Sequence, residues 1–139
     1  METDIYIGIL DKGQRPSPKS YGYVLEAREK KGATAEGFGD LPEATLHKAT
    51  LSALIAAMRR FRTPCTVIVH AEDAGVLARL EAESTAWDEG AHTKEGAANR
   101  EEWEELRELT RGYLILTEPG KHIYSGWLET SLRERRGEA

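Results

Sequence analysis

Two adjacent acidic residues, Glu72 and Asp73, come directly after residues 66–70 (TVIVH), an apolar run that predicts a strand in a sheet interior. An amphipathic helix is expected to begin at once, from Ala74. In α/β proteins, ligand and metal sites commonly lie at the carboxyl end of a strand, beside the turn into a helix. Carboxylate oxygens at such a place suit hard cations such as Mg²⁺. Three interpretations fit: a metal site, the remnant of one, or a helix cap formed by Asp73.

The elements that must position these acids follow from the spacing of apolar residues. Ile5, Ile7 and Ile9 alternate with other residues in the segment 3–13, which predicts a strand. Further strands are expected at residues 21–32, 33–41 and 113–117, and helices at residues 43–62, 74–87, 99–112 and 124–136. Asp40 and Glu43 have the spacing of a capping box, so the first helix is expected to begin near Pro42 or Ala44.

The order of elements is three strands, a helix, a strand, two helices, a strand and a helix, or βββαβααβα. Because strand–helix–strand crossovers join parallel strands, we expect parallel pairing among the later strands. This predicts an α/β protein with one mixed, five-stranded sheet. At 139 residues, the chain fits one domain with a single core.

Several segments resemble, in the right order, those of the ribonuclease H-like superfamily. They are residues 20–32 (SYGYVLEAREKKG), 49–58 (ATLSALIAAM), 64–73 (PCTVIVHAED) and 99–106 (NREEWEEL), the last preceded by Trp87. The set is similar to a divergent, small type 1 ribonuclease H-like protein. The resemblance implies one ribonuclease H-like domain over residues 1–139, with helices on both faces of the sheet.

The resemblance also implies an activity and its residues. That family hydrolyses the RNA strand of RNA–DNA hybrids with two Mg²⁺ ions held by four carboxylates, one ion activating water and the other stabilising the leaving oxygen. Its fourth-strand ligand falls on Glu72, beside Asp73, and its terminal-helix ligand matches Glu129. His122 falls in a mobile, His-containing loop of the family, thought to assist product release.

The family's other two carboxylate positions fall on residues of this chain that carry no carboxylate. The first-strand Asp falls on Gly8, and Asp11, three residues later, would need a register slip or a bulge to replace it. The central-helix Glu falls on Leu46, with Glu43 about one turn earlier. The metal site is therefore expected to be incomplete, with hybrid hydrolysis impaired or lost on a domain that keeps a nucleic-acid role.

Two alternatives stay open. The first is an active endonuclease that needs Mg²⁺ or Mn²⁺ and uses a rearranged set of acids. Its catalytic candidates are Asp11, Glu43, Glu72, Asp73, Glu129 and His122, with Asp11, Glu72 and Glu129 as metal ligands. The second is a protein-interaction module that does not contact nucleic acid.

A residual nucleic-acid role is expected to use the basic residues Arg28, Lys30, Lys31, Arg59 and Arg60. Further contacts are expected from three residues around the loop between the second and third helices. They are Trp87, as a stacking surface, Lys94 in the polar loop 88–98, and Asn99 at the start of the next helix. The net charge of −5 is unfavourable, because neutralising phosphates supplies most non-specific affinity for nucleic acid. Any binding of an RNA–DNA hybrid or another nucleic acid is therefore expected to be local or weak.

Cysteine content and hydropathy indicate a compartment. The lone Cys65 excludes an internal disulfide framework. No apolar run approaches the roughly 18 residues needed to cross a bilayer. The opening segment METDIYIGIL has no basic leader before its apolar stretch. We expect a cytoplasmic protein without membrane association; the sequence leaves its oligomeric state open.

Overall fold

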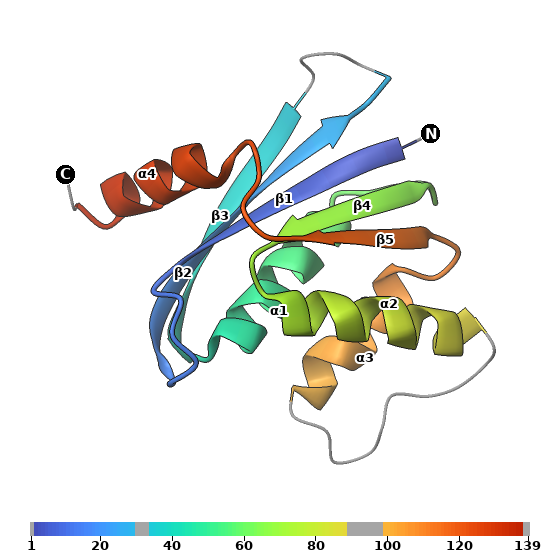
Figure 1. Ribbon diagram of the computed structural model, residues 1–139, viewed down its shortest axis with the longest axis horizontal. Helices are drawn as coiled ribbons and strands as arrows, with labels where there is room; N and C mark the ends of the chain where they lie inside the picture. Colours follow the sequence, from blue (N-terminus) through green and yellow to red (C-terminus); the bar gives the residue numbers. More distant parts are fainter. Residues whose placement is uncertain (1, 30–33, 89–98, 138–139) are drawn as a thin grey trace.

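A mixed, five-stranded sheet carries the remaining elements of the chain (Figure 1). The computed structural model describes residues 2–29, 34–88 and 99–137, and the side chains of these residues except 85–88. The elements are β1 (Glu2–Leu10), β2 (Ser17–Ala27), β3 (Thr34–Ala44), α1 (Leu46–Met58), β4 (Thr66–Ala71), α2 (Ala74–Asp88), α3 (Arg100–Leu109), β5 (Leu114–Pro119) and α4 (Ser125–Arg135). Their order confirms the predicted βββαβααβα arrangement.

The strands lie in the order β3-β2-β1-β4-β5. β1 pairs antiparallel with β2, and β2 pairs antiparallel with β3. β4 pairs parallel with both β1 and β5. Because β1 and β4 are parallel neighbours, their carboxyl ends meet at one edge of the sheet, and the segments after Leu10 and Ala71 lie close together.

The helices form layers on both faces of the sheet, as predicted. Figure 1 shows α1, α2 and α3 on one face and α4 on the other. α1 contacts β1, β2, β3 and α3, α2 contacts β4 and β5, and α4 contacts β1 and β2. Within the described ranges, none of the helices is long and apolar enough to cross a membrane.

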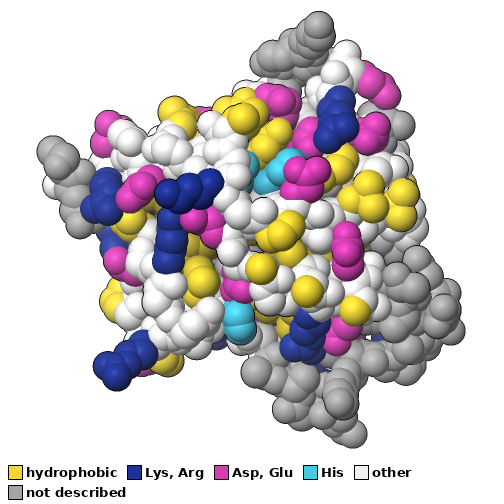
Figure 2. Space-filling view, in the orientation of Figure 1, with side chains coloured by type: hydrophobic (Ala, Val, Ile, Leu, Met, Phe, Trp, Pro, Cys, Tyr) yellow, Lys and Arg dark blue, Asp and Glu magenta, His cyan; other side chains and the backbone are white. Residues whose placement is uncertain are grey.

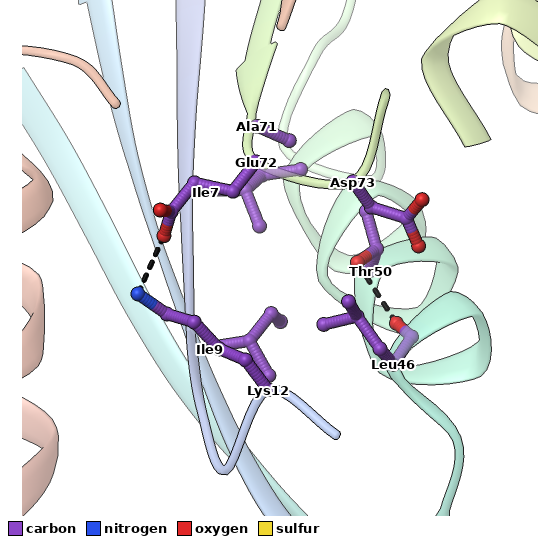
Figure 3. Close-up of a pocket in the computed structure, with 8 residues that line it drawn as sticks. All are labelled: Ile7, Ile9, Lys12, Leu46, Thr50, Ala71, Glu72 and Asp73. Carbon is purple, nitrogen blue, oxygen red and sulfur yellow. Dashed lines mark hydrogen bonds and ion pairs between the residues drawn. The ribbon is translucent and has the colours of Figure 1, made fainter. Parts of the chain in front are cut away.

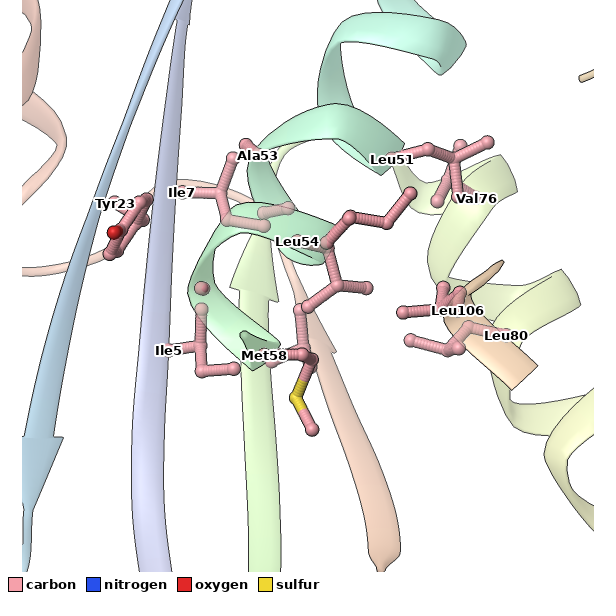
Figure 4. Close-up of a cluster of buried hydrophobic side chains, with 14 of the residues drawn as sticks. Ile5, Ile7, Tyr23, Leu51, Ala53, Leu54, Met58, Val76, Leu80 and Leu106 are labelled. Atoms are coloured by element: carbon pink, nitrogen blue, oxygen red, sulfur yellow. The ribbon is translucent and has the colours of Figure 1, made fainter. Parts of the chain in front are cut away.

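The main core lies between the sheet and α1 (Figure 4). The buried face of β1 contributes Ile5, Ile7 and Ile9, which meet the apolar face of α1. Leu80 of α2 and Leu106 of α3 close the far side of the helix layer and are fully buried. Burying each large aliphatic side chain of this kind stabilises the fold by about 1.5–3 kcal/mol. The apolar circumference of this segment predicts a central helix buried against the sheet, and the nearly all-round burial of α1 agrees with that prediction.

The predicted start of α1 was wrong. β3 continues through Pro42 and Glu43 to Ala44, because it keeps pairing with β2 beyond a register shift near Ser17. β3 is an edge strand, where a proline is tolerated because its missing N–H removes no ladder bond to a further strand. Thr45 caps the helix instead, its hydroxyl accepting from the Lys48 backbone N–H at 3.2 Å.

The sequence predicts Trp103 and Trp127 as core residues, and the structure bears this out for Trp103 alone. Trp103 of α3 is buried in the core. Trp127 of α4 is 43% exposed and lies against Phe38, with ring centroids 6.2 Å apart. Leu128 and Leu132, one turn apart, take the buried positions of α4.

Candidate functional site

Glu72 follows β4 directly, at the edge where β1 also ends. Its carboxylate forms an ion pair with Lys12, with 2.6 Å between Oε2 and Nζ. The pair lies in a small pocket whose walls come from β1, β4 and α1 (Figure 3). Its other lining residues are Ile7, Ile9, Leu46, Thr50, Ala71 and Asp73. The carboxylate that the sequence pattern selected is therefore neutralised by an ammonium group of the same chain.

Asp73 acts as a helix cap, one of the three interpretations of the acidic pair. Its Oδ1 accepts from the Val76 backbone N–H at 3.2 Å, and its side chain is buried. Its Oδ2 pairs with Nδ1 of His47 from α1. Figure 3 shows the carboxylates of Glu72 and Asp73 pointing in opposite directions. Asp73 thus stabilises the α2 start rather than joining Glu72 around a common point.

At the first-strand position, Gly8 lies beneath Leu128 of α4. A Cβ atom built on Gly8 would lie 2.8 Å from the Leu128 Cβ, closer than real side chains approach. Gly22, the partner of Gly8 in β2, lies under the same leucine, and a Cβ atom built on it would lie 3.0 Å from the Leu128 Cδ2. Helix α4 therefore packs against two glycines, and an apolar side chain fills the space beside β1.

The remaining acidic candidates are separate from one another. Asp11 pairs with Arg136 at 2.7 Å, and Glu129 pairs with Arg133 at 3.0 Å on the exposed side of α4. The hydrogen bond and charge of Arg133 hold the pKa of Glu129 below its usual value. Glu43 is exposed near the end of β3. Among the residues that the structure describes, no group of three or more His, Cys, Asp or Glu side chains could hold a metal ion.

His122 has defined partners at both ring nitrogens. Nε2 donates to the carbonyl oxygen of Ile7 at 2.8 Å, and Nδ1 accepts from the Tyr124 backbone N–H at 3.2 Å. Because Nδ1 accepts, the ring is held neutral with its proton on Nε2. Burial lowers the pKa of His122 below its ordinary value. In this arrangement the imidazole ties the loop before α4 to β1.

A second polar cluster, on the α4 face of the sheet, was missed from sequence. Asp4 is buried and accepts two bonds from the Arg28 guanidinium, at 2.9 and 3.1 Å, and one from His70 Nε2, at 2.8 Å. Burial opposes ionisation of Asp4, but the bonds from Arg28 and His70 outweigh it and lower its pKa. The His70 ring stacks on Tyr6 with centroids 4.3 Å apart. The alternation of side chains between the two faces of β1 could have indicated this cluster, because it places Asp4 and Tyr6 on the face opposite Ile5.

Of the predicted nucleic-acid contacts, Asn99 lines a shallow pocket at the starts of α1, α2 and α3. Asn99 precedes α3 with a left-handed backbone, φ 59°, and its side chain makes no capping bond to that helix. It lines the pocket with His47, Gly75, Val76, Arg79 and Trp103. The Arg79 guanidinium lies over the Trp103 ring, 4.4 Å from its centroid. Lys94 and the side chain of Trp87 lie outside the described residues.

The strand order, the parallel β1–β4–β5 unit and the helices on both faces define the ribonuclease H-like fold. The chain is similar to LC9-RNase H1, a type 1 RNase H with the type 2 active-site motif. The TM-score is 0.71 at 17% identity, over 99% of this chain and 74% of that one. RNase H1 from the halophilic archaeon Halobacterium salinarum matches with a TM-score of 0.65 at 23% identity, over 100% of both chains.

A third similar structure is the foamy viral protease-reverse transcriptase in complex with dsDNA. Its TM-score is 0.63 at 15% identity, over 93% of this chain and 88% of that one. No protein-family model matches the sequence, and no curated protein matches it significantly. The likeness therefore lies in the fold, which confirms the resemblance drawn from the ordered motifs.

The fold family implies divalent metal ions, and the side chains present do not fit two of them. Gly8 and Leu46 bring no oxygen ligand, and Leu128 packs where a Gly8 side chain would need space. Glu72 is paired with Lys12 and Asp73 with His47. Two Mg²⁺ ions need several carboxylate or carbonyl oxygens in near-octahedral shells.

Proposed function

We propose that this domain binds nucleic acid, with RNA–DNA hybrid as the first candidate ligand, and that its hydrolysis of the RNA strand is impaired or lost. The packing of Leu128 on Gly8 is the observation that carries the second half. The Leu128 side chain fills the space beside Gly8, the position that the resemblance assigns to the first-strand ligand, with hydrocarbon. A charged carboxylate or a divalent ion placed there would lose its hydration without gaining ligands.

Two observations support the first half of the proposal. The fold is shared with RNase H proteins and with a reverse transcriptase solved in complex with dsDNA. The pocket at the helix starts brings together side chains that carry hydrogen-bond donors, from His47, Arg79 and Asn99. Arg79 also pairs with Glu83, and His47 with Asp73. Such donors suit phosphate and sugar oxygens, which receive most hydrogen bonds in protein–DNA complexes.

Surface charge sets the expected strength of binding. On the face of the molecule that Figure 2 shows, Lys and Arg side chains are intermingled with Asp and Glu side chains. With a net charge of −5, binding should be weak at physiological salt and should strengthen as salt is lowered.

The test combines cleavage with binding. Labelled RNA–DNA hybrid is incubated with wild-type protein and the Glu72→Ala variant in Mg²⁺ and in Mn²⁺, and binding is measured at low salt. We expect binding without cleavage. Metal-dependent cleavage that Glu72→Ala abolishes would contradict this and favour the rearranged nuclease. Failure to bind hybrid, duplex or single strands would favour the protein-interaction alternative.

One observation favours that second candidate function. Ile123, just before α4, is 74% exposed, and Trp127 of α4 is 43% exposed. They border a groove whose other walls are Val24, Thr34, Glu36 and Tyr124. Exposed apolar residues that border a groove are typical of protein contacts. A protein ligand at this groove would leave the pocket at the helix starts unaffected.

A further inference from the structure

Lys12 reaches the carboxyl edge of the sheet because of an unusual turn after β1. Asp11, the residue between β1 and Lys12, has a positive φ of 68°, which turns the chain out of the strand direction. The Lys12 ammonium then meets the Glu72 carboxylate, which follows the neighbouring strand β4. At 2.6 Å this is a short, charge-assisted contact between two groups that sequence spacing alone would not join.

The Lys12 ammonium is placed where its charge acts on several of the candidate site residues. Its charge acts on Glu72 through direct contact, and at longer range it adds to the effect of Arg133 in lowering the pKa of Glu129. It also disfavours protonation of His122, whose pKa is already lowered by burial. One positive charge therefore acts on three of the residues that the sequence pattern marks as catalytic candidates.

We propose that the Lys12 ammonium is the built-in cation of this site. It neutralises Glu72 in place of a divalent ion, and it offers its remaining N–H groups to a phosphate of bound nucleic acid. The second part rests on the proposed function, whereas the first part does not. The chain would thus contact the phosphate backbone here without any metal ion.

The Lys12 ammonium and a divalent ion would compete for a single carboxylate, that of Glu72. A Mg²⁺ ion needs its ligand oxygens at about 2.1 Å and keeps a full octahedral shell. Ile7, Ile9 and Leu46 give the pocket apolar walls. Its other oxygen-bearing side chains are engaged, because the Asp73 carboxylate accepts from the Val76 N–H and pairs with His47, and the Thr50 hydroxyl donates to the Leu46 carbonyl. A divalent ion at Glu72 would also be repelled by the adjacent ammonium. The ammonium has three donors, one of which meets Glu72, and the Lys12 side chain is 45% exposed, so others can face a ligand.

The first arm of the test measures cation exclusion without nucleic acid. Backbone amide signals of residues 71–73 are followed by NMR during titration with Mn²⁺, whose unpaired electrons broaden nearby signals even at low occupancy. We expect little broadening in the wild type, clear broadening in Lys12→Met, and wild-type behaviour in Lys121→Met, an exposed lysine outside the pocket. Equal broadening in wild type and Lys12→Met, whether strong or absent, would overturn the cation role.

The second arm measures the phosphate contact. Hybrid affinity is determined over a range of salt concentrations for wild type, Lys12→Met and Lys121→Met, with Mg²⁺ and with EDTA at matched ionic strength. Losing one phosphate contact should lower the salt slope by about 0.9 in Lys12→Met. The Lys121→Met slope should equal that of the wild type, and EDTA should leave wild-type affinity unchanged.

The outcomes separate the two claims. An unchanged slope in Lys12→Met, or wild-type binding that EDTA abolishes, would overturn the phosphate contact. If no variant binds hybrid at low salt, the proposed function and the phosphate contact both fail, while the Mn²⁺ titration still decides the cation role. Unchanged thermal unfolding of both methionine variants establishes that folding is not the cause of any difference.

Discussion

Leu128 of α4 lies so close to Gly8 of β1 that a Cβ on the glycine would be 2.8 Å from the leucine Cβ. Gly8 is the position that the sequence resemblance assigns to the first-strand metal ligand. The contact depends on the absence of a side chain in β1 and on an apolar side chain in α4. The glycine at position 8 and the packing of the terminal helix are therefore one structural feature.

Restoring an acid at this position should damage the fold. We expect Gly8→Asp to lower the free energy of unfolding by about 1–3 kcal/mol from overpacking, with a further penalty for the buried charge. Gly13→Asp is the matched control, because a Cβ at Gly13 meets nothing within 4 Å. Urea denaturation measures both. If Gly8→Asp were as stable as Gly13→Asp and gained Mn²⁺ binding, the close packing described here would be refuted.

The capping role of Asp73 gives a second prediction. Asp73→Ala removes the acceptor for the Val76 N–H and should cost about 1–2 kcal/mol of stability. Asp73→Asn keeps a side-chain oxygen for the same N–H and should cost clearly less. Thermal unfolding of the two variants provides the comparison. Equal losses would mean that the pairing with His47, rather than the cap, dominates the role of Asp73.

Local periodicity was sufficient to predict the elements. The alternation of Ile5, Ile7 and Ile9 predicted β1, and the apolar circumference of residues 46–58 predicted a buried α1. The predicted helix start near Pro42 was wrong because pairing with β2 extends β3 to Ala44. The residues that cap helices carry no information about such pairing with a distant strand. The prediction of a buried Trp127 was wrong because Leu128 and Leu132, four residues apart, occupy the buried face of α4.

The candidate site was predictable only in part. The resemblance predicts that Gly8 and Leu46 stand at two of the four ligand positions, where neither brings a carboxylate. The ion pair between Glu72 and Lys12 could not be predicted from the sequence. It depends on the positive φ of Asp11, a backbone conformation that a residue other than glycine gives little reason to expect. Pairing between Asp4 and Arg28, 24 residues apart, likewise depends on the β1–β2 register.

The neutral His122 predicts a pH dependence of stability. Because its folded pKa lies below the unfolded value of about 6.5, the unfolded state binds the proton more readily between these two values. The contribution of His122 is therefore complete above about pH 6.5 and is lost as pH falls through the folded pKa. In His122→Gln, unfolding between about pH 7 and pH 5 should depend less on pH. An unchanged profile would show that this histidine does not titrate with folding.

The Asp4–Arg28 pair predicts resistance to acid. Because the folded pKa of Asp4 lies below the ordinary value of 3.8, its stabilisation is present above that value and is lost as pH falls through the folded pKa. Arg28→Gln removes the two guanidinium bonds and leaves the buried carboxylate with His70, so the pKa of Asp4 should rise. We expect the acid-unfolding midpoint, followed by circular dichroism, to move to higher pH. Arg111→Gln, which removes an exposed partner of Glu108 within the same turn, should leave the midpoint where it is in the wild type. A common shift in both variants would assign the effect to net charge rather than to the buried pair.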